Sequence, residues 1–165
     1  MSMTVLRKMN AKTINRRRAA TERGAQFVEL AIVVPILFML IAAVAEFGNY
    51  FYTYSMLTKS TRVAARYLTA STYDADQKTA AANLAVCGNP STTAGACGSS
   101  TILNGLATSN VEITNTGSNV VPTTVTVRII NYNYRPVINL NKWTGGLLNN
   151  VSVSPSTTMR YMPWR

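Results

Sequence analysis

The chain has 165 residues, of which 47% are hydrophobic and 13% are charged, whereas ordinary soluble domains carry about 25% charged residues. Its formal net charge is +10 and it contains no histidine. Without histidine it lacks the commonest general base, the Ser-His-Asp and Cys-His arrangements and a usual metal ligand. We therefore expect no enzyme activity, no cofactor and no metal site. The low charged share and one concentrated apolar segment favour a membrane protein.

The positive charge is concentrated at the N-terminus. Seven of the sixteen basic residues precede residue 24, whereas residues 25–165 hold nine basic and five acidic side chains. A basic cluster directly before an apolar segment follows the positive-inside rule, which keeps that cluster in the cytoplasm. We therefore expect residues 1–24 to be a flexible cytoplasmic leader. The same distribution argues against nucleic acid as a partner, because positive-inside topology already explains it.

Residues 30–45 form a charge-free apolar run of sixteen, bounded by Glu29 and Glu46. The two carboxylates are seventeen residues apart, which is about 25 Å along a helix and close to the ~30 Å hydrocarbon core of a bilayer. We expect one transmembrane helix that makes contact with lipid and has an aromatic belt after Glu46. Pro35 lies inside this helix and is expected to kink it, or to affect its packing.

The helix is predicted to continue beyond the membrane to residue 70. Apolar and small residues recur at spacings of three and four between residues 50 and 68, and Lys59, Arg62 and Arg66 repeat on another face. This pattern is amphipathic. Its apolar face packs either on the chain's own outer domain or on neighbouring subunits. Glu46 is either a helix-packing residue or a carboxylate at the outer interface.

A second, short helix is predicted to run through Val86, with Thr72 or Asp74 as its N-cap. Cys87 and Cys97 then enclose nine residues rich in Gly, Ser, Thr and Pro. This spacing does not match zinc-finger ligands. In an oxidising compartment the two cysteines are expected to form a disulfide, and two reduced thiols are the alternative.

The last third of the chain alternates between apolar and polar residues, as strands do. The alternating segments are residues 110–114, 124–134, 150–154 and 157–161. Residues 115–119 are a turn signal between the first two. We expect an α+β fold in which three or four antiparallel strands bury one face against the long helix. The predicted organisation is a leader at residues 1–24, a helix at residues 25–70 and an extracytoplasmic domain at residues 71–165.

The start of the apolar segment carries a processing pattern. Gly24 ends the basic leader, Ala25 follows, and Glu29 is the fifth residue after Gly24. A secretory signal peptide would instead place a small-residue cleavage site after a shorter apolar region. The arrangement resembles the one that prepilin peptidases cut after the glycine; such a cut would keep the apolar helix and give Ala25 a terminal amine. A carboxylate in the membrane costs several kcal/mol, and pairing of Glu29 with the Ala25 amine of another subunit would offset this cost and set the register of adjacent helices.

Further residues extend this pattern along the helix. They are Arg23-Gly24, Val28-Glu29, Ala31, Pro35, Glu46-Phe47-Gly48, Leu57-Thr58 and Ala65-Arg66-Tyr67. With these marks, residues 23–69 resemble the TadE-like family of the tight-adherence (Flp) pilus systems. The resemblance extends weakly to Val125, Val127, Thr158 and Arg160. The chain departs from the family at Asn49, where a basic residue is frequent, and at Val63-Ala64, where an acidic residue and a glycine are frequent.

The resemblance implies a pilin-like fold and the role of a minor pseudopilin. Such a protein is cut by a dedicated prepilin peptidase and works with other pseudopilins and pilin subunits, an inner-membrane platform and an assembly ATPase. It would sit in the bacterial inner membrane with its outer domain in the periplasm, or enter the pilus. Two other classes stay open: an uncleaved single-pass anchor whose periplasmic domain binds a ligand or partner, and a basic protein that acts on nucleic acid.

Overall fold

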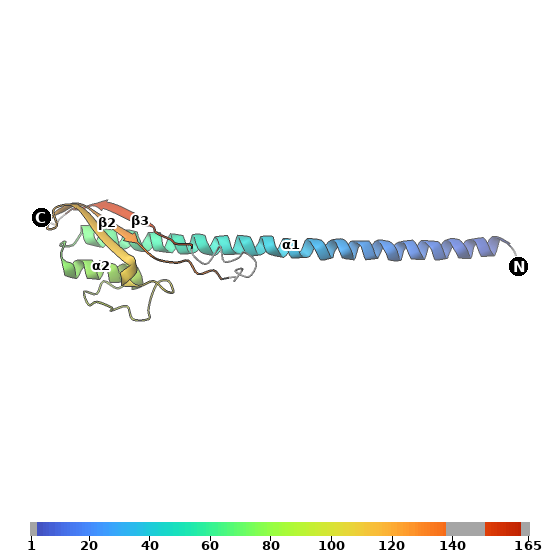
Figure 1. Ribbon diagram of the computed structural model, residues 1–165, viewed down its shortest axis with the longest axis horizontal. Helices are drawn as coiled ribbons and strands as arrows, with labels where there is room; N and C mark the ends of the chain where they lie inside the picture. The colour runs from blue at the N-terminus through green and yellow to red at the C-terminus, as the bar shows by residue number, and fades with distance from the viewer. Residues whose placement is uncertain (1–2, 138–150, 163–165) are drawn as a thin grey trace. The chain divides into compact units, whose positions relative to one another are not determined.

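The computed structural model describes residues 3–137 and 151–162, and within its first helix it describes side chains at residue 24 and from residue 26 onward. The described elements are α1 (Met3–Thr69), α2 (Ala75–Cys87), the 3₁₀ turn η1 (Thr108–Asn110), β1 (Val111–Gly117), β2 (Pro122–Ile129) and β3 (Ser156–Arg160). Figure 1 labels the main helices and strands in chain order. The chain divides into two compact units, Met1–Ala45 and Glu46–Arg165. The expected α+β class, with a long helix and a small antiparallel sheet, is confirmed.

The first unit is the N-terminal part of α1, and from Phe27 to its end most of the side chains that the structure describes are apolar and exposed. Among the described residues, α1 is the one helix long and apolar enough to cross a membrane. Its most apolar window has a mean hydropathy of 2.8, and no part of that window is buried. Phe38 and Met39 are about two-thirds exposed, at 69% and 65%. Such a continuous apolar surface marks a contact with lipid or with other proteins.

The structure differs from the sequence prediction before residue 24. The backbone is already helical from Met3, so the flexible leader expected at residues 1–24 is instead continuous with α1. Adding residues to an existing helix is far easier than nucleating one, and Ala, Lys and Arg are good helix formers. The helix also continues through Pro35 without interruption.

The second unit combines the end of α1 with α2 and a three-stranded antiparallel sheet in the order β1-β2-β3. Asp74 is the N-cap of α2, and its side chain accepts a hydrogen bond from the Gln77 amide at 2.8 Å. The other candidate cap, Thr72, donates to the Asp74 carboxylate at 2.6 Å instead. Gly88 ends α2 in the left-handed conformation, with φ of 74°, a conformation that glycine adopts readily.

Three of the predicted strands are present, with three corrections. β1 continues to Gly117, so the first three residues of the segment predicted as a turn, 115–119, belong to the strand. β2 ends at Ile129 rather than near residue 134. Two residues later Asn131 adopts a positive φ of 53°, which turns the chain away from the extended conformation. The strand predicted at residues 150–154 is reduced to an isolated bridge between Asn133 and Ser152, and residue 150 lies outside the described residues.

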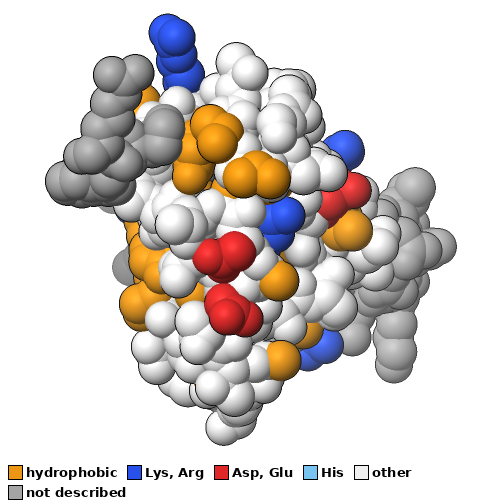
Figure 2. Space-filling view, turned by 90° about the vertical axis from the view of Figure 1, so that its left-hand side faces the viewer, with side chains coloured by type: hydrophobic (Ala, Val, Ile, Leu, Met, Phe, Trp, Pro, Cys, Tyr) orange, Lys and Arg blue, Asp and Glu red, His pale blue; other side chains and the backbone are white. Residues whose placement is uncertain are grey.

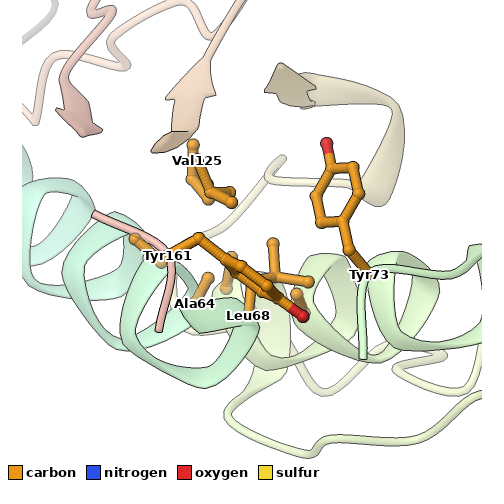
Figure 3. Packing of buried hydrophobic residues seen from close by; sticks show 9 residues of the cluster. Ala64, Leu68, Tyr73, Val125 and Tyr161 are labelled. Carbon is orange, nitrogen blue, oxygen red and sulfur yellow. The ribbon is translucent and has the colours of Figure 1, made fainter. Parts of the chain in front are cut away.

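Two clusters of buried side chains hold the second unit together. In the first, shown in Figure 3, Ala64 and Leu68 of α1 meet Val125 of β2 and Tyr161 after β3. The Tyr161 hydroxyl donates to the Ser71 carbonyl oxygen at 2.8 Å, which ties the end of the sheet to the end of α1.

The second cluster joins α1 and α2 to the sheet further along, through the fully buried Leu57 and Ile129. Thr61, also fully buried, meets Thr157 of β3, with 3.0 Å between their hydroxyl oxygens. The sequence left open whether the apolar face of α1 packs on the chain's own outer domain or on neighbouring subunits. The two clusters show that beyond residue 56 this face packs on the chain's own outer unit.

The surface of the second unit is mixed in character. Lys59, Arg62 and Arg66 are exposed, as the amphipathic pattern predicts. Figure 2 looks at the side that lies on the left in Figure 1, and shows small separate apolar areas with acidic and basic side chains among uncoloured polar surface. This face therefore differs from the continuous apolar surface of the first unit.

Candidate functional site

The candidate processing site lies on α1 in the first unit. Gly24 is exposed, and a Cβ atom built on it would meet nothing within 4 Å. Glycine inside a helix costs about 1 kcal/mol relative to alanine. No packing in the described part of the chain requires glycine at this position. The backbone of Ala25 belongs to α1, and its side chain lies outside the described residues.

Glu29 is exposed on the apolar surface of α1. Its neighbours Val28 and Leu30 are 62% and 55% exposed. No residue whose side chain is described forms a hydrogen bond or ion pair with Glu29. Glu29 lies four residues after Ala25, so the two positions share one helix face at a separation of about 6 Å along the axis. A terminal amine at residue 25 would therefore lie one helical turn from this carboxylate.

Pro35 is also exposed on this part of α1. Its predicted role in packing between helices stays a prediction.

Glu46, the carboxylate after the apolar run, is not at an open interface. It is only 7% exposed. One of its carboxylate oxygens accepts a hydrogen bond from the Tyr134 hydroxyl at 2.5 Å and from the Val137 amide at 3.3 Å. These contacts are with its own outer unit; a place for Glu46 at the outer membrane interface, or in packing between helices, stays a prediction.

Tyr134 is the centre of this polar cluster. The Asn49 side-chain amide donates to the Tyr134 hydroxyl oxygen at 2.6 Å, and the Tyr50 ring meets the Tyr134 ring edge-on, with centroids 5.2 Å apart. Burial, and then the hydrogen bond to Glu46, raise the pKa of Tyr134 to about 12, against a smaller lowering by Asn49. The hydroxyl is thereby held in its neutral, donating form.

Sequence reasoning missed Tyr134. Its partner Glu46 lies 88 residues away in the chain, and a local sequence pattern does not predict a contact over such a separation. Asn49, where the resemblance leads us to expect a basic residue, supplies an uncharged donor to this tyrosine.

Cys87 and Cys97 form a disulfide, with their Cα atoms 5.6 Å apart. The bond closes the loop that follows α2 and links it to the helix end. A disulfide is typical of an oxidising, extracytoplasmic compartment. In the described part of the chain, no group of three or more His, Cys, Asp and Glu side chains is placed to hold a metal ion.

Comparison with known proteins gives a match within α1. Neither the curated proteins nor the solved structures contain a significant match. The family model of TadE-like proteins matches residues 24–66. This range begins at the exposed Gly24, includes Glu29 and Glu46, and ends at Arg66 near the end of α1. Residues 24–66 of the chain are therefore a domain of the TadE-like family.

Proposed function

We propose that this chain is a minor pseudopilin that is cut after Gly24 and then takes part in assembling a tight-adherence (Flp-type) pilus at the bacterial inner membrane. The observation that carries the proposal is the start of α1. There an exposed glycine without a packing role is followed by an exposed carboxylate on an otherwise apolar surface. The TadE-like match, which begins at the same glycine, supports this assignment.

The proposed cut has a direct electrostatic consequence. It removes the basic residues of the leader and leaves Ala25 as the first residue of a helix. Its terminal amine and the unsatisfied amides of the first turn then make that helix end positive. Glu29 stabilises this end from within its own helix, or pairs with the Ala25 amine of an adjacent subunit. The second arrangement sets the axial register between neighbouring helices, and it shields the carboxylate from lipid.

The proposed partners follow from this role. They are the prepilin peptidase, other pseudopilins and pilin subunits, the inner-membrane platform with its ATPase, and the lipid bilayer. The disulfide supports a periplasmic outer unit. The apolar part of α1 supports membrane insertion, with the N-terminus in the cytoplasm.

The test of the cut is the mass and N-terminal sequence of the protein extracted from membranes of cells that carry the pilus system. We expect the wild-type chain to begin at Ala25 and the Gly24→Asp variant to keep its leader. Gly48→Asp is the matched control, because Gly48 is also a helical glycine of α1 whose Cβ would meet nothing within 4 Å. A wild-type chain that still begins at residue 1 or 2 in piliated cells would overturn the proposal and favour the uncleaved anchor.

The test of the pairing uses Glu29. Glu29→Ala should still be inserted and cut, but should co-purify with partner subunits at a level reduced by about tenfold, the equivalent of ~1.4 kcal/mol. Glu29→Asp keeps the charge and should restore part of that loss. Normal pilus assembly by the Glu29→Ala strain would refute the pairing while leaving the cut untouched.

A further inference from the structure

We propose that an exposed row of cations on the second-unit part of α1 is a docking surface for an acidic helix of a partner protein. The row consists of Lys59, Arg62 and Arg66 and is called the basic stripe. The inference concerns the second unit only. It does not depend on cleavage at Gly24 or on a role in pilus assembly.

The basic stripe continues a straight line of side chains on the accessible side of α1. Tyr52, Ser55, Lys59, Arg62 and Arg66 follow one another at intervals of three, four, three and four residues. Such intervals keep side chains on one side of a helix. Tyr52 is 58% exposed, Ser55 is half-buried and the three cations are exposed. The cations therefore succeed one another at about 4.5 and 6 Å along the helix axis.

The charge of the basic stripe is not compensated by the described part of the chain. No described residue forms a hydrogen bond or ion pair with the side chain of Lys59, Arg62 or Arg66. The sequence has no Asp or Glu between Glu46 and Asp74, so α1 has no carboxylate one turn away from any of the three. Like charges three and four residues apart destabilise a helix, and opposite charges beside them stabilise it. The stripe therefore favours an acidic partner.

The opposite face of α1 argues against a lipid surface as the partner. A basic helix that binds in the plane of a membrane inserts an apolar face beneath the lipid headgroups. In this part of α1 the apolar face is occupied, because the fully buried Leu57, Ala64 and Leu68 belong to the two clusters that join α1 to the sheet (Figure 3). The basic stripe is thus presented without an apolar face that could enter lipid, which favours a protein.

The spacing of the cations fits a helix better than a strand. On another helix, carboxylates at intervals of three and four residues also succeed one another at about 4.5 and 6 Å. Side chains on one face of a strand recur only every ~6.6 Å, so they fall out of step with the stripe. Two helices packed side by side stay in contact over several turns. An acidic helix can therefore place one carboxylate beside each cation.

A second copy of this chain does not supply such a helix. Two copies packed in register would bring like charges of the basic stripe together. The acidic residues of the second unit are the buried Glu46, the pair Asp74 and Asp76 at the start of α2, and Glu112 on β1. They do not form a row of three on one helix face. The charge pattern therefore points to a different protein, with carboxylates at intervals of three and four residues.

The probe is a dye-labelled, Ala-rich helical peptide of about 24 residues. It carries Leu at the positions that would face Tyr52 and Ser55, and Glu at those that would face the three cations. The peptide is added to the full-length protein in phosphatidylcholine nanodiscs, and fluorescence anisotropy measures the bound fraction against empty nanodiscs. Because exposed ion pairs are individually weak, we expect saturable binding with a Kd between about 10 μM and 1 mM. At about 0.5 M NaCl the Kd should rise at least tenfold.

Charge reversals locate the surface. Arg62→Glu, at the centre of the basic stripe, should weaken binding of the acidic peptide by at least about tenfold, the equivalent of ~1.4 kcal/mol. Arg160→Glu is the matched control, because Arg160 is an exposed arginine of the same unit on β3, and it should change the Kd by less than about twofold. A peptide with Lys in place of Glu should bind the wild type at least tenfold more weakly than the acidic peptide. Reversal of all three cations to Glu should invert this preference.

Several outcomes would overturn the proposal. Absence of saturable binding at about 1 mM acidic peptide would show that the stripe does not dock such a helix. Equal losses for Arg62→Glu and Arg160→Glu would show that net charge, not the basic stripe, attracts the peptide. Binding of the wild type to added phosphatidylglycerol vesicles that Arg62→Glu abolishes would assign the stripe to anionic lipid. Self-association of the protein alone, also abolished by Arg62→Glu, would assign it to a second copy of this chain.

Discussion

Removal of the Tyr134 hydroxyl is expected to destabilise the outer unit by roughly 2–3 kcal/mol. The hydroxyl is buried and donates to the Glu46 carboxylate at 2.5 Å while accepting from Asn49 at 2.6 Å. A hydrogen bond to a carboxylate contributes about 1.5–3 kcal/mol, and a neutral one about 0.5–1.5 kcal/mol. Tyr134→Phe loses both bonds and leaves a buried carboxylate with one donor fewer, while the ring still fills its space against Tyr50.

The assay is thermal unfolding of the full-length protein in detergent, followed by near-UV circular dichroism. For a unit of this size, the loss corresponds to a fall in Tm of roughly 6–15 °C. Tyr52→Phe is the matched control, because Tyr52 is 58% exposed on α1, and the same substitution there should change stability by less than about 0.5 kcal/mol.

The pH dependence gives a second signature with a definite sign. The pKa of Tyr134 is raised to about 12 in the folded protein, from an ordinary value near 10. A raised folded-state pKa means that this contribution is fully present below about pH 10 and is lost as pH rises toward 12. At pH 11 the unfolding free energy of the wild type should be lower than at neutral pH by about 1.4 kcal/mol because of Tyr134 alone. The Tyr134→Phe variant should not show this loss.

The difference in unfolding free energy between the wild type and Tyr134→Phe should therefore be constant from pH 7 to 9 and smaller at pH 11. An unchanged Tm for Tyr134→Phe at neutral pH would refute the hydrogen-bond network. A difference of the same size at both pH values would refute the account of its protonation.

Three further predictions concern the outer unit. Replacing both Cys87 and Cys97 with Ala should cost about 2–3 kcal/mol by the chain-entropy estimate. The intact mass of the wild type should increase by two hydrogen atoms when a reductant opens the disulfide, and a variant as stable as the oxidised protein would contradict the expected cost. Leu68→Ala, at a fully buried position, should cost about 2–5 kcal/mol, whereas Arg66→Ala on the exposed face of α1 should stay within about 0.5 kcal/mol in the same denaturant titration. Hydrogen bonds from Thr72 and then Gln77 lower the pKa of Asp74, so its stabilising effect should be present above about pH 4 and be lost as pH falls below that value. Thermal unfolding of Asp74→Asn between pH 2 and 7 checks this, and a pH profile identical to that of the wild type would exclude the proposed cause.

The features that the sequence determined by itself are those encoded within a few neighbouring residues. The apolar run after Glu29 specifies a long exposed helix, because apolar composition over such a length suits lipid. The Gly24–Glu29 spacing predicts a processing site from six consecutive residues. Asp74 was one of two candidate caps, because capping depends on the side chain and the next three amides. The alternating segments predicted β1, β2 and β3, since strand faces repeat every second residue.

The tertiary structure alone decided the contacts between distant segments. Glu46 stood next to the apolar run and fitted an open interface, yet Tyr134, 88 residues away, buries it. The amphipathic face of α1 was compatible with either the chain's own domain or a neighbour, and the sheet packed against Leu68 made that choice. Only the register between β1 and β2 decided which amides of β1 bond to β2 and which point away from the sheet. The physical reason is that pairing between distant segments depends on how loops close and surfaces fit across the whole domain, and a local pattern records neither.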